Sequence, residues 1–264
     1  MNETNPLAVV TGASSGIGLE LARQFAQHGY DLLITAEDAE LAAAAAALDD
    51  YGTEVHSVRT DLTTFEGVEE LHRNITATGR PVAAVALNAG VGRGGAFLDT
   101  DLADEQRIID LNITSTVHLA KRILPAMVED GHGRVLMTSS IASTMPGPFQ
   151  AVYNASKSFV QSFAQALANE LKDTGVTVTA LMPGPTDTEF FERADMLDTK
   201  VGTADKDDPA PVAAQAFDAL MAGKTKIVAG SVKTRLHGLA NRVLPDGAKA
   251  QAHRRMAEPG SSDQ

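Results

Sequence analysis

The sequence has no cysteine and no tryptophan among its 264 residues. Without cysteine the protein cannot form disulfides, bind zinc through thiolates or use a thiol nucleophile. No apolar run approaches the ~20 residues that a membrane-spanning helix needs, and residues 1–6 lack the basic residue with which a signal peptide begins. We therefore expect a cytoplasmic protein with no membrane partner.

Positive charge is also scarce, because 22 Lys and Arg face 34 Asp and Glu, which gives a net charge of −12. Lys and Arg supply most of a protein's affinity for nucleic-acid phosphates, so this balance favours a small-molecule partner over a nucleic acid. The seven histidines lack the spacing of metal ligands, and we predict no metal site. Residues 231–264 are locally basic, and we interpret them as a helical extension that is solvent-exposed or contacts another subunit.

Short apolar runs alternate with longer segments of helical period from Leu7 onward. This alternation predicts an α/β protein with a Rossmann-type, doubly wound, seven-stranded parallel sheet and helices on both faces. The length suits a single domain. The predicted strands are residues 7–10, 32–35, 55–58, 82–87, 134–138, 176–181 and 226–229.

The segments between the strands carry helix signals. Ile17, Leu21 and Phe25 form an apolar stripe that Gly29 ends, and further helices are predicted at residues 38–50, 64–78, 101–128 and 150–173. Pro125 should kink or end the fourth of these helices. Residues 186–208 show no clear period, and we interpret them as a lid over a site. The core would then comprise residues 1–230, and residues 231–264 would extend it without forming a separate domain.

A glycine-rich turn follows the first predicted strand and opens the first helix. Glycines at such a turn let the backbone approach a pyrophosphate, whose charge is stabilised by the free N–H groups of a helix N-terminus. The alternative is a glycine turn that binds no ligand, but the strand before it and the helix after it are the context that the motif requires. The candidate phosphate-binding residues are Gly12, Ser14, Ser15, Gly16, Ile17 and Gly18.

Glu37 ends the second predicted strand, 19 residues after Gly18. An acidic side chain there can accept hydrogen bonds from the adenosine ribose and would repel a 2′-phosphate. No Arg or Lys occupies residues 13–15 or 36–38, so NAD is favoured, although NADP is not excluded. Alternatively, Glu37 and Asp38 only stabilise the dipole of the second helix.

Tyr153 and Lys157 are four residues apart in a helical stretch, so they share one face. A nearby ammonium group can lower the pKa of a phenol and make it a usable acid or base. Ser140 ends the fifth predicted strand, at the edge where open parallel sheets bind ligands. Taken singly, these residues could equally be a surface pair and a strand-end turn.

Several motifs in this order resemble those of short-chain dehydrogenases/reductases. The resemblance extends from Leu7 to about Gly230 and includes residues 11–18, Asp61 and Leu62, Asn88, Ala89 and Gly90, Asn112, Ser140, Tyr153 with Lys157, Pro183 and Gly184, and Thr186 and Thr188. It implies a catalytic tetrad of Asn112, Ser140, Tyr153 and Lys157.

The resemblance also implies a role for each group. The tyrosine exchanges the hydroxyl proton while the nicotinamide transfers hydride, and the serine polarises the carbonyl. The lysine binds the nicotinamide ribose and lowers the tyrosine pKa, and the asparagine holds a helical irregularity and a water. Asp61 and Leu62 would lie near adenine, residues 183–188 near nicotinamide, and residues 190–208 over the substrate. Relatives are commonly homodimers or homotetramers.

The candidate substrate wall is apolar, which suggests a hydrophobic carbonyl or alcohol substrate. Its members would be Val91, Ile141, Met145, Phe149, Phe190, Phe191 and Met196, beside Ser140 and Tyr153. The same residues could instead close the core under the lid. Arg93 and Arg193 could contact a carboxylate or could be ordinary surface charges. Two alternatives stay open: a 3-oxoacyl thioester reductase, and a non-catalytic dinucleotide-sensing regulator or scaffold.

Overall fold

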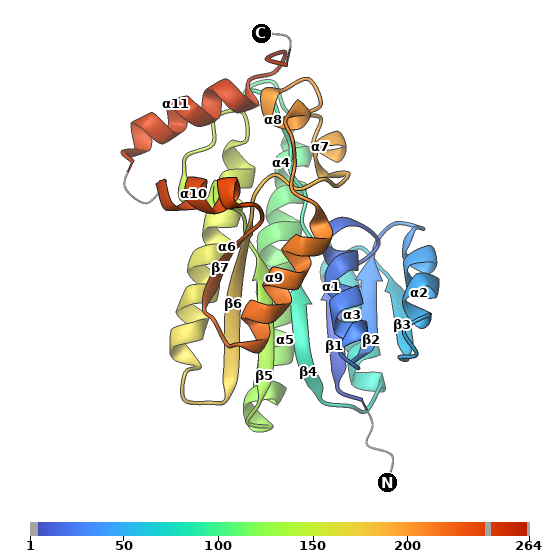
Figure 1. Ribbon diagram of the computed structural model, residues 1–264. Helices are drawn as coiled ribbons and strands as arrows, with labels where there is room; N and C mark the ends of the chain where they lie inside the picture. Colours follow the sequence, from blue (N-terminus) through green and yellow to red (C-terminus); the bar gives the residue numbers. More distant parts are fainter. Residues whose placement is uncertain (1–4, 241–243, 263–264) are drawn as a thin grey trace.

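The computed structural model describes residues 5–240 and 244–262, so Arg242 and Asp263 of the predicted extension lie outside the described residues. One seven-stranded parallel sheet forms its centre, with strand order β3-β2-β1-β4-β5-β6-β7 (Figure 1). The order reverses between β1 and β4, and ligands of open α/β sheets bind outside the carboxyl ends of the strands at such a reversal. The strands are β1 (Leu7–Thr11), β2 (Asp31–Ala36), β3 (Val55–Arg59), β4 (Val82–Leu87), β5 (Gly133–Thr138), β6 (Val176–Pro183) and β7 (Lys226–Ala229).

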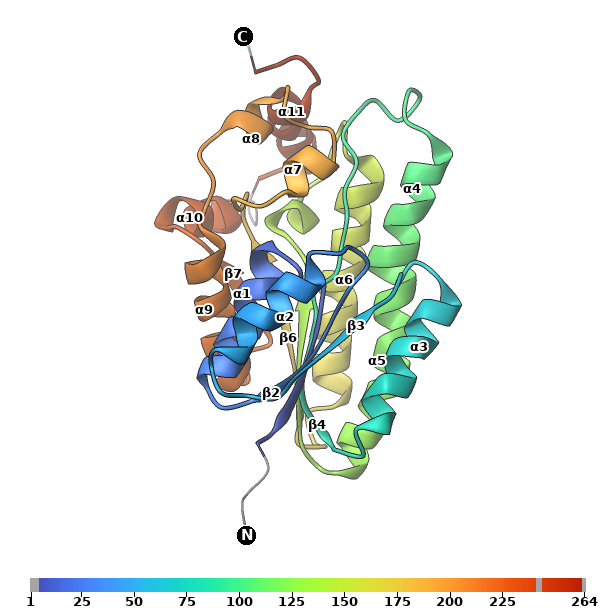
Figure 2. The same cartoon turned by 90° about the vertical axis from the view of Figure 1, so that its right-hand side faces the viewer.

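Helices cover both faces of the sheet, as the edge-on view in Figure 2 shows. One face packs against α1 (Gly16–Gln27), α2 (Leu41–Asp49) and α9 (Pro209–Met221). The other face packs against α3 (Phe65–Ala77), α5 (Ser115–Glu129) and α6 (Ala151–Glu170). Beyond the carboxyl ends of the strands lie α7 (Phe190–Arg193), α8 (Lys200–Thr203) and α11 (Asp246–Ala257).

The predicted fold and its seven strands are confirmed. The central strands are largely apolar runs because helices cover both of their faces, and every residue of β1 and β2 is buried, whereas the edge strand β3 has no buried residue. The bounds of β4 and β7 are those predicted, whereas β6 runs two residues further, to Pro183. The carboxyl ends of β1, β4, β5 and β6 therefore deliver the predicted site residues to one edge of the sheet.

Helix α9 was not predicted from the sequence, and two of the predicted helices differ clearly from their expected form. Helix α2 begins at Leu41 and not at Asp38, because Asp38 accepts a hydrogen bond from the Ser14 hydroxyl and stays in the loop. The predicted helix over residues 101–128 consists of α4 (Leu102–Ile109), a π-helical segment, Asp110–Thr114, and α5. Pro125 does not end α5, which continues to Glu129. Buried side chains on either side of the proline, Ile123 and Met127, offset its missing hydrogen bond.

The segment between β6 and α9 is an irregular loop, as predicted, that contains α7 and α8. A parallel bridge between Thr186 and Asp207 joins its two ends. Its buried side chains, Phe191, Ala194 and Met196, form a small apolar cluster with Ala257 of α11, apart from the two large cores on the faces of the sheet. The loop therefore packs against the C-terminal helix. In the ranges 5–240 and 244–262, no helix combines the length and the apolar character that crossing a bilayer requires.

Candidate dinucleotide and catalytic site

A single cavity at the carboxyl edge of the sheet gathers most of the predicted site residues. Three predicted residues do not line it: Asn112 lies behind its wall, and Phe149 and Met196 belong to the small apolar cluster formed by the loop between β6 and α9. The predicted residues that line it are Gly12, Ser14, Ser15, Gly16, Ile17, Gly18, Glu37, Asp61, Leu62, Asn88, Ala89, Gly90, Val91, Ser140, Ile141, Met145, Tyr153, Lys157, Pro183, Gly184, Thr186, Thr188, Phe190 and Phe191.

The glycine-rich turn between β1 and α1 has the close contacts that its sequence predicts. Gly16 has a φ of +54°, and a Cβ atom there would lie 2.7 Å from a methyl carbon of Thr188. A Cβ at Gly18 would lie 1.9 Å from the carbonyl oxygen of Gly12, so a larger residue cannot fit without moving the backbone. The Asn88 amide donates a hydrogen bond to the Thr11 carbonyl at 3.2 Å and ties the end of β4 to this turn. The turn and the first residues of α1 line the cavity, and a helix N-terminus in such a place is suited to binding an anion.

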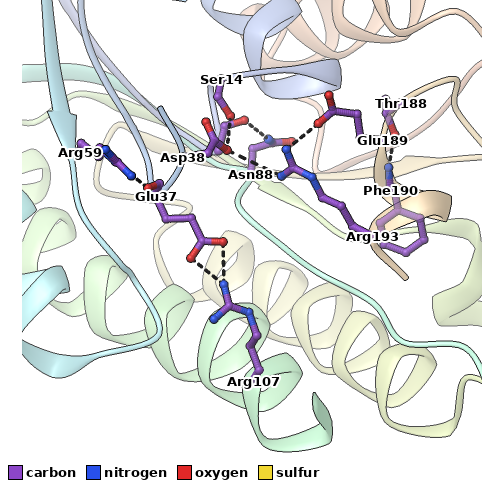
Figure 3. A network of polar contacts seen from close by, with 11 residues as sticks. Ser14, Glu37, Asp38, Arg59, Asn88, Arg107, Thr188, Glu189, Phe190 and Arg193 are labelled. Carbon is purple, nitrogen blue, oxygen red and sulfur yellow. Dashed lines mark hydrogen bonds and ion pairs between the residues drawn. The ribbon is translucent and has the colours of Figure 1, made fainter. Parts of the chain in front are cut away.

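The end of the cavity that Glu37 lines contains an ion pair that the sequence did not suggest. The Arg107 guanidinium of α4 donates to both carboxylate oxygens of Glu37 at 2.6 Å (Figure 3). The bond to Glu37 is the main cause of the raised pKa of Arg107. Arg59 donates to the backbone carbonyl of Glu37 at 2.8 Å. Residues 13–15 and 36–38 hold no basic residue, as the sequence analysis states, but the fold brings the Arg107 guanidinium to Glu37 from 70 positions away in sequence.

A second set of polar contacts connects the glycine-rich turn, through Asp38, to the loop between β6 and α9 (Figure 3). The Ser14 hydroxyl donates to Asp38 at 2.9 Å, and the Arg193 guanidinium lies 3.7 Å from the same carboxylate oxygen. Arg193 also pairs with Glu189 within α7 and its flank. Arg193 therefore faces the nucleotide end of the cavity, and its charge is partly neutralised there.

The predicted catalytic side chains of α6 point toward the end of β5. The Lys157 ammonium donates to the Thr138 carbonyl at 2.9 Å and lies 5.9 Å from the centre of the Tyr153 ring. Lys157 and Ser140 are buried, whereas Tyr153 is partly exposed to the cavity. Ser139 fixes the backbone of this helix by donating to the Lys157 carbonyl at 2.7 Å. Serine, tyrosine and lysine therefore lie in one wall.

Burial is the main cause of the shifted pKa values of Tyr153 and Lys157. It raises the pKa of Tyr153 to about 12, and the Ser140 hydroxyl has the smaller, lowering effect. Burial also lowers the pKa of Lys157 to about 8. The causes of the raised pKa of Tyr153 do not include Lys157, whose ammonium donates to the Thr138 carbonyl. The phenol therefore carries its proton at neutral pH, as a general acid must.

Asn112 lies in the π-helical segment, so the helical irregularity implied at this residue is present. Its side-chain amide pairs with the backbone of Val91 in both directions: its Oδ1 accepts from the N–H and its Nδ2 donates to the carbonyl, each at 2.9 Å. The same amide donates to Ser156 of α6 at 2.9 Å. Asn112 thus fixes the wall of the cavity from behind.

Aromatic side chains border the other half of the cavity, beyond Ser140 and Tyr153. The rings of Tyr153 and Phe190 are 5.1 Å apart, and Phe190 meets Phe191 edge to face at 5.3 Å. The C-terminal helix completes this wall with residues that the sequence analysis left unassigned: Lys249, Ala252, His253, Met256 and Ala257. In the described part of the chain, no three His, Asp or Glu side chains are grouped as a metal site requires.

A family model described as short chain dehydrogenase matches residues 6–196. The chain belongs to the short-chain dehydrogenase/reductase family. It is therefore an NAD(P)-dependent oxidoreductase. Oxidoreductase UcpA of Salmonella typhimurium is 32% identical over 210 residues, which cover 79% of this chain and 78% of that protein. Sulfoacetaldehyde reductase 2 of Chromohalobacter salexigens is 34% identical over 186 residues, which cover 70% of this chain and 74% of that protein.

Solved structures of the family share the whole fold. A short-chain dehydrogenase from Sphingobium yanoikuyae in complex with NADPH has a TM-score of 0.79 and 30% identity, covering 90% of this chain and 93% of that one. A family member from Burkholderia phymatum in complex with NAD has a TM-score of 0.82 and 25% identity, covering 92% and 94%. These neighbours support a nicotinamide cofactor and do not decide between NAD and NADP.

Two functional features of this short-chain dehydrogenase/reductase were missed by sequence reasoning. Arg107 gives no local signal, because only the packing of α4 beside the adenosine end brings it to Glu37. The contribution of α11 to the cavity also depends on tertiary contacts. The sequence shows that residues 231–264 are locally basic, but it does not indicate which part of the protein α11 packs against.

Proposed function

We propose that this enzyme transfers a hydride between a nicotinamide cofactor and a carbonyl or secondary alcohol substrate, with Tyr153 as the general acid/base. The observation that supports the proposal is that two groups of residues line the same cavity. The phosphate-binding turn of residues 12–18 lines one end, and Ser140, Tyr153 and Lys157 line the wall beyond it. A non-catalytic sensor would need the first group but gains nothing from the second.

The chain's own groups divide the chemistry between them. The Ser140 hydroxyl donates a hydrogen bond to the substrate oxygen and polarises the carbonyl. Tyr153, whose pKa of about 12 keeps it protonated, gives its proton to the developing alkoxide. Lys157 binds the nicotinamide ribose, and Asn112 holds Val91 in place behind it. The cofactor, when bound, supplies or accepts the hydride.

NAD is the proposed cofactor. Glu37 lines the cavity at its adenosine end, where its carboxylate can accept hydrogen bonds from ribose hydroxyls and repel a 2′-phosphate. Arg107 weakens this preference, because it neutralises Glu37 and presents a guanidinium to the same region. The neighbours bind NADPH in one case and NAD in another.

The proposed substrate is a carbonyl compound with an apolar body, because Ile141, Met145, Phe190 and Phe191 line the cavity near Tyr153. A 3-oxoacyl thioester would meet the same apolar wall and is the alternative substrate class. One relative is named for sulfoacetaldehyde, a small aldehyde that carries a negative charge. The apolar wall suggests a large substrate, whereas the name of this relative suggests a small one. The carbonyl compounds to be tested therefore include both large apolar and small charged molecules.

A titration followed by turnover assays tests the proposal. NADH and NADPH are titrated against the protein by calorimetry, and the tighter cofactor is then used with ketones, aldehydes and a 3-oxoacyl thioester. We expect NADH to bind more tightly and at least one carbonyl class to consume it. If the cofactor binds and no carbonyl in the panel consumes it, the sensor alternative replaces the enzyme.

We also propose a homodimer or a homotetramer. Large apolar side chains are exposed on and beside α4 and α6: Leu98 is 92% exposed, Leu102 79%, Phe97 61% and Phe159 39%. Such a group is costly to leave in water and suits a subunit interface. Light scattering should give a multiple of the 27.7 kDa chain mass, and a monomer at micromolar concentration would contradict the proposal. A cytoplasmic location remains a prediction from the sequence.

A further inference from the structure

The C-terminal helix α11 forms part of the wall of the substrate half of the cavity, although it lies outside the stretch that the family model matches. Lys249, Ala252, His253 and Met256 lie along one side of this helix and line the cavity. The catalytic wall of Ser140 and Tyr153 belongs to the same cavity. The extension therefore supplies residues that a substrate can touch.

Hydrogen bonds hold α11 against the segment that joins the two catalytic residues. The Lys249 ammonium donates to the Thr144 carbonyl at 3.1 Å, and His253 donates through Nδ1 to the Pro148 carbonyl at 3.1 Å. Both carbonyls belong to the connection between Ser140 and Tyr153. The position of the helix is thus fixed relative to the reacting groups.

The chain after α11 is bonded to the loop between β6 and α9. The Lys200 N–H donates to the Ser261 hydroxyl at 3.0 Å, and the Gly260 N–H donates to the Asp198 carboxylate at 2.7 Å. Ala257 is 1% exposed and packs in the apolar cluster of the lid. Because it is anchored on both sides, α11 is a defined wall and not a loose tail.

Charge divides the described cavity lining into two halves. All of its carboxylates lie on the side proposed for the nucleotide. Glu189 belongs to this group because it pairs with Arg193, which also lies near Asp38. The four carboxylates are Glu37, Asp38, Asp61 and Glu189. Among the described lining residues beyond Tyr153, the ionisable side chains are Lys249 and His253. Burial lowers the pKa of His253, so at neutral pH this ring is uncharged. Lys249 is therefore the cation of the substrate half.

The Lys249 ammonium can donate a hydrogen bond to one further partner. Its side chain is 11% exposed, and two of its three N–H groups are engaged by the described residues, at the Thr144 carbonyl and at Asp246 Oδ1, 2.9 Å away. The Asp246 side chain is 80% exposed, so water screens this pair strongly. Thr144 and Asp246 lie outside the described cavity lining, so an anionic group inside the cavity would have to draw the ammonium away from Asp246 into a drier place, where a charge-assisted hydrogen bond is stronger.

The two arginines that the sequence offered for this role are engaged elsewhere. Arg93 pairs with Asp104 at 3.4 Å and with Asp195 at 3.1 Å and does not belong to the described cavity lining. Arg193 pairs with Glu189 and Asp38 at the nucleotide end. Lys249 is the described cation that remains for the substrate.

We propose that Lys249 is a specificity-determining residue that binds an anionic group, a carboxylate or a sulfonate, at the end of the substrate remote from its carbonyl. The substrate would then be an oxo acid whose apolar middle lies along Phe190 and Met256 while its carbonyl meets Ser140 and Tyr153. This inference deepens the proposed function and depends on it for the reaction, whereas the binding of the anion can be measured on its own.

The test compares Lys249→Met with Arg255→Met. Both remove one positive charge from α11, but Arg255 is exposed and outside the described cavity lining. The ligands are a medium-chain oxo carboxylate, the oxo sulfonate of the same length and the methyl ester of the carboxylate. Binding to the cofactor-saturated protein is measured by calorimetry, and turnover is measured in parallel.

We expect Lys249→Met to weaken binding and raise KM for at least one of the two anions by about tenfold or more, about 1.4 kcal/mol. The change for the methyl ester, which reports the loss of the bond to Thr144 without the loss of anion recognition, should be much smaller. The anion whose binding weakens identifies the recognised group as a carboxylate or a sulfonate. Arg255→Met should leave the binding and the KM of both anions unchanged. Lys249→Arg should keep most of the preference, which separates charge recognition from the loss of the bond to Thr144.

Three results would overturn the role of Lys249: an unchanged ratio of anion to ester binding in Lys249→Met, an equal shift in Arg255→Met, or wild-type protein that binds the ester as tightly as both anions. Thermal unfolding of each variant shows whether α11 is still docked. If the anions bind in a Lys249-dependent manner but are never reduced, Lys249 keeps its role and the proposed reaction is wrong.

Discussion

Tyr153→Phe is expected to lower kcat for carbonyl reduction by about 10² to 10⁴, the usual contribution of a positioned acid/base. The substitution removes only the hydroxyl, and the ring can still pack on Phe190, whose centre is 5.1 Å away. The affinity for the dinucleotide should therefore stay close to that of the wild type. Single-turnover rates with saturating cofactor and a calorimetric Kd measure the two quantities separately.

Tyr30→Phe is the matched control for this substitution. The Tyr30 hydroxyl contacts the sulfur of Met221, and the residue does not belong to the described cavity lining, so the same chemical change should leave kcat unaltered. Wild-type turnover in Tyr153→Phe would show that another group supplies the proton. A parallel loss in cofactor affinity would show that the phenol matters for binding instead of proton transfer.

Glu37→Gln is expected to improve the binding of NADPH by about tenfold or more, about 1.4 kcal/mol. The substitution removes the charge that repels a 2′-phosphate and releases Arg107, which holds both carboxylate oxygens at 2.6 Å. A free guanidinium suits a phosphate group, because it donates two parallel hydrogen bonds. The affinity for NADH should fall or stay constant, since an amide is the weaker acceptor for ribose hydroxyls.

Two further variants isolate the cause. Glu40→Gln removes a nearby carboxylate that is exposed and outside the described cavity lining, and it should leave both affinities unchanged. In the double variant Glu37→Gln with Arg107→Met, the gain for NADPH should disappear if the guanidinium binds the 2′-phosphate. Wild-type protein that prefers NADPH would show that Arg107 already outweighs Glu37.

The sheet and the ligand edge were predictable because their causes are local. A strand covered on both faces is largely apolar along its length, and β4 accordingly has the bounds that its apolar run predicts. The crowded glycine turn also has a local cause, because Gly18 leaves no room for a side chain. Short-range rules therefore sufficed for the phosphate end of the site.

The remaining features depend on contacts between distant segments. Glu37 and Arg107 meet only because α4 packs beside the end of β2, and no spacing rule connects them. The pKa of Tyr153 follows from burial, which a four-residue spacing from Lys157 does not reveal. Phe149 and Met196 were expected in the substrate wall on their apolar character, but the fold uses them to pack the lid.

The order of the strands reverses between β1 and β4, so a dinucleotide bound at this reversal would bridge two halves of the sheet. Any ligand that binds only the folded chain shifts the unfolding equilibrium in proportion to its saturation, by about 2.7 kcal/mol at a hundredfold excess over Kd. Because the cofactor would touch both β1–β3 and β4–β6, this stabilisation reaches both halves at once. A well-supplied cellular pool of dinucleotide would thus also protect the enzyme against proteolysis.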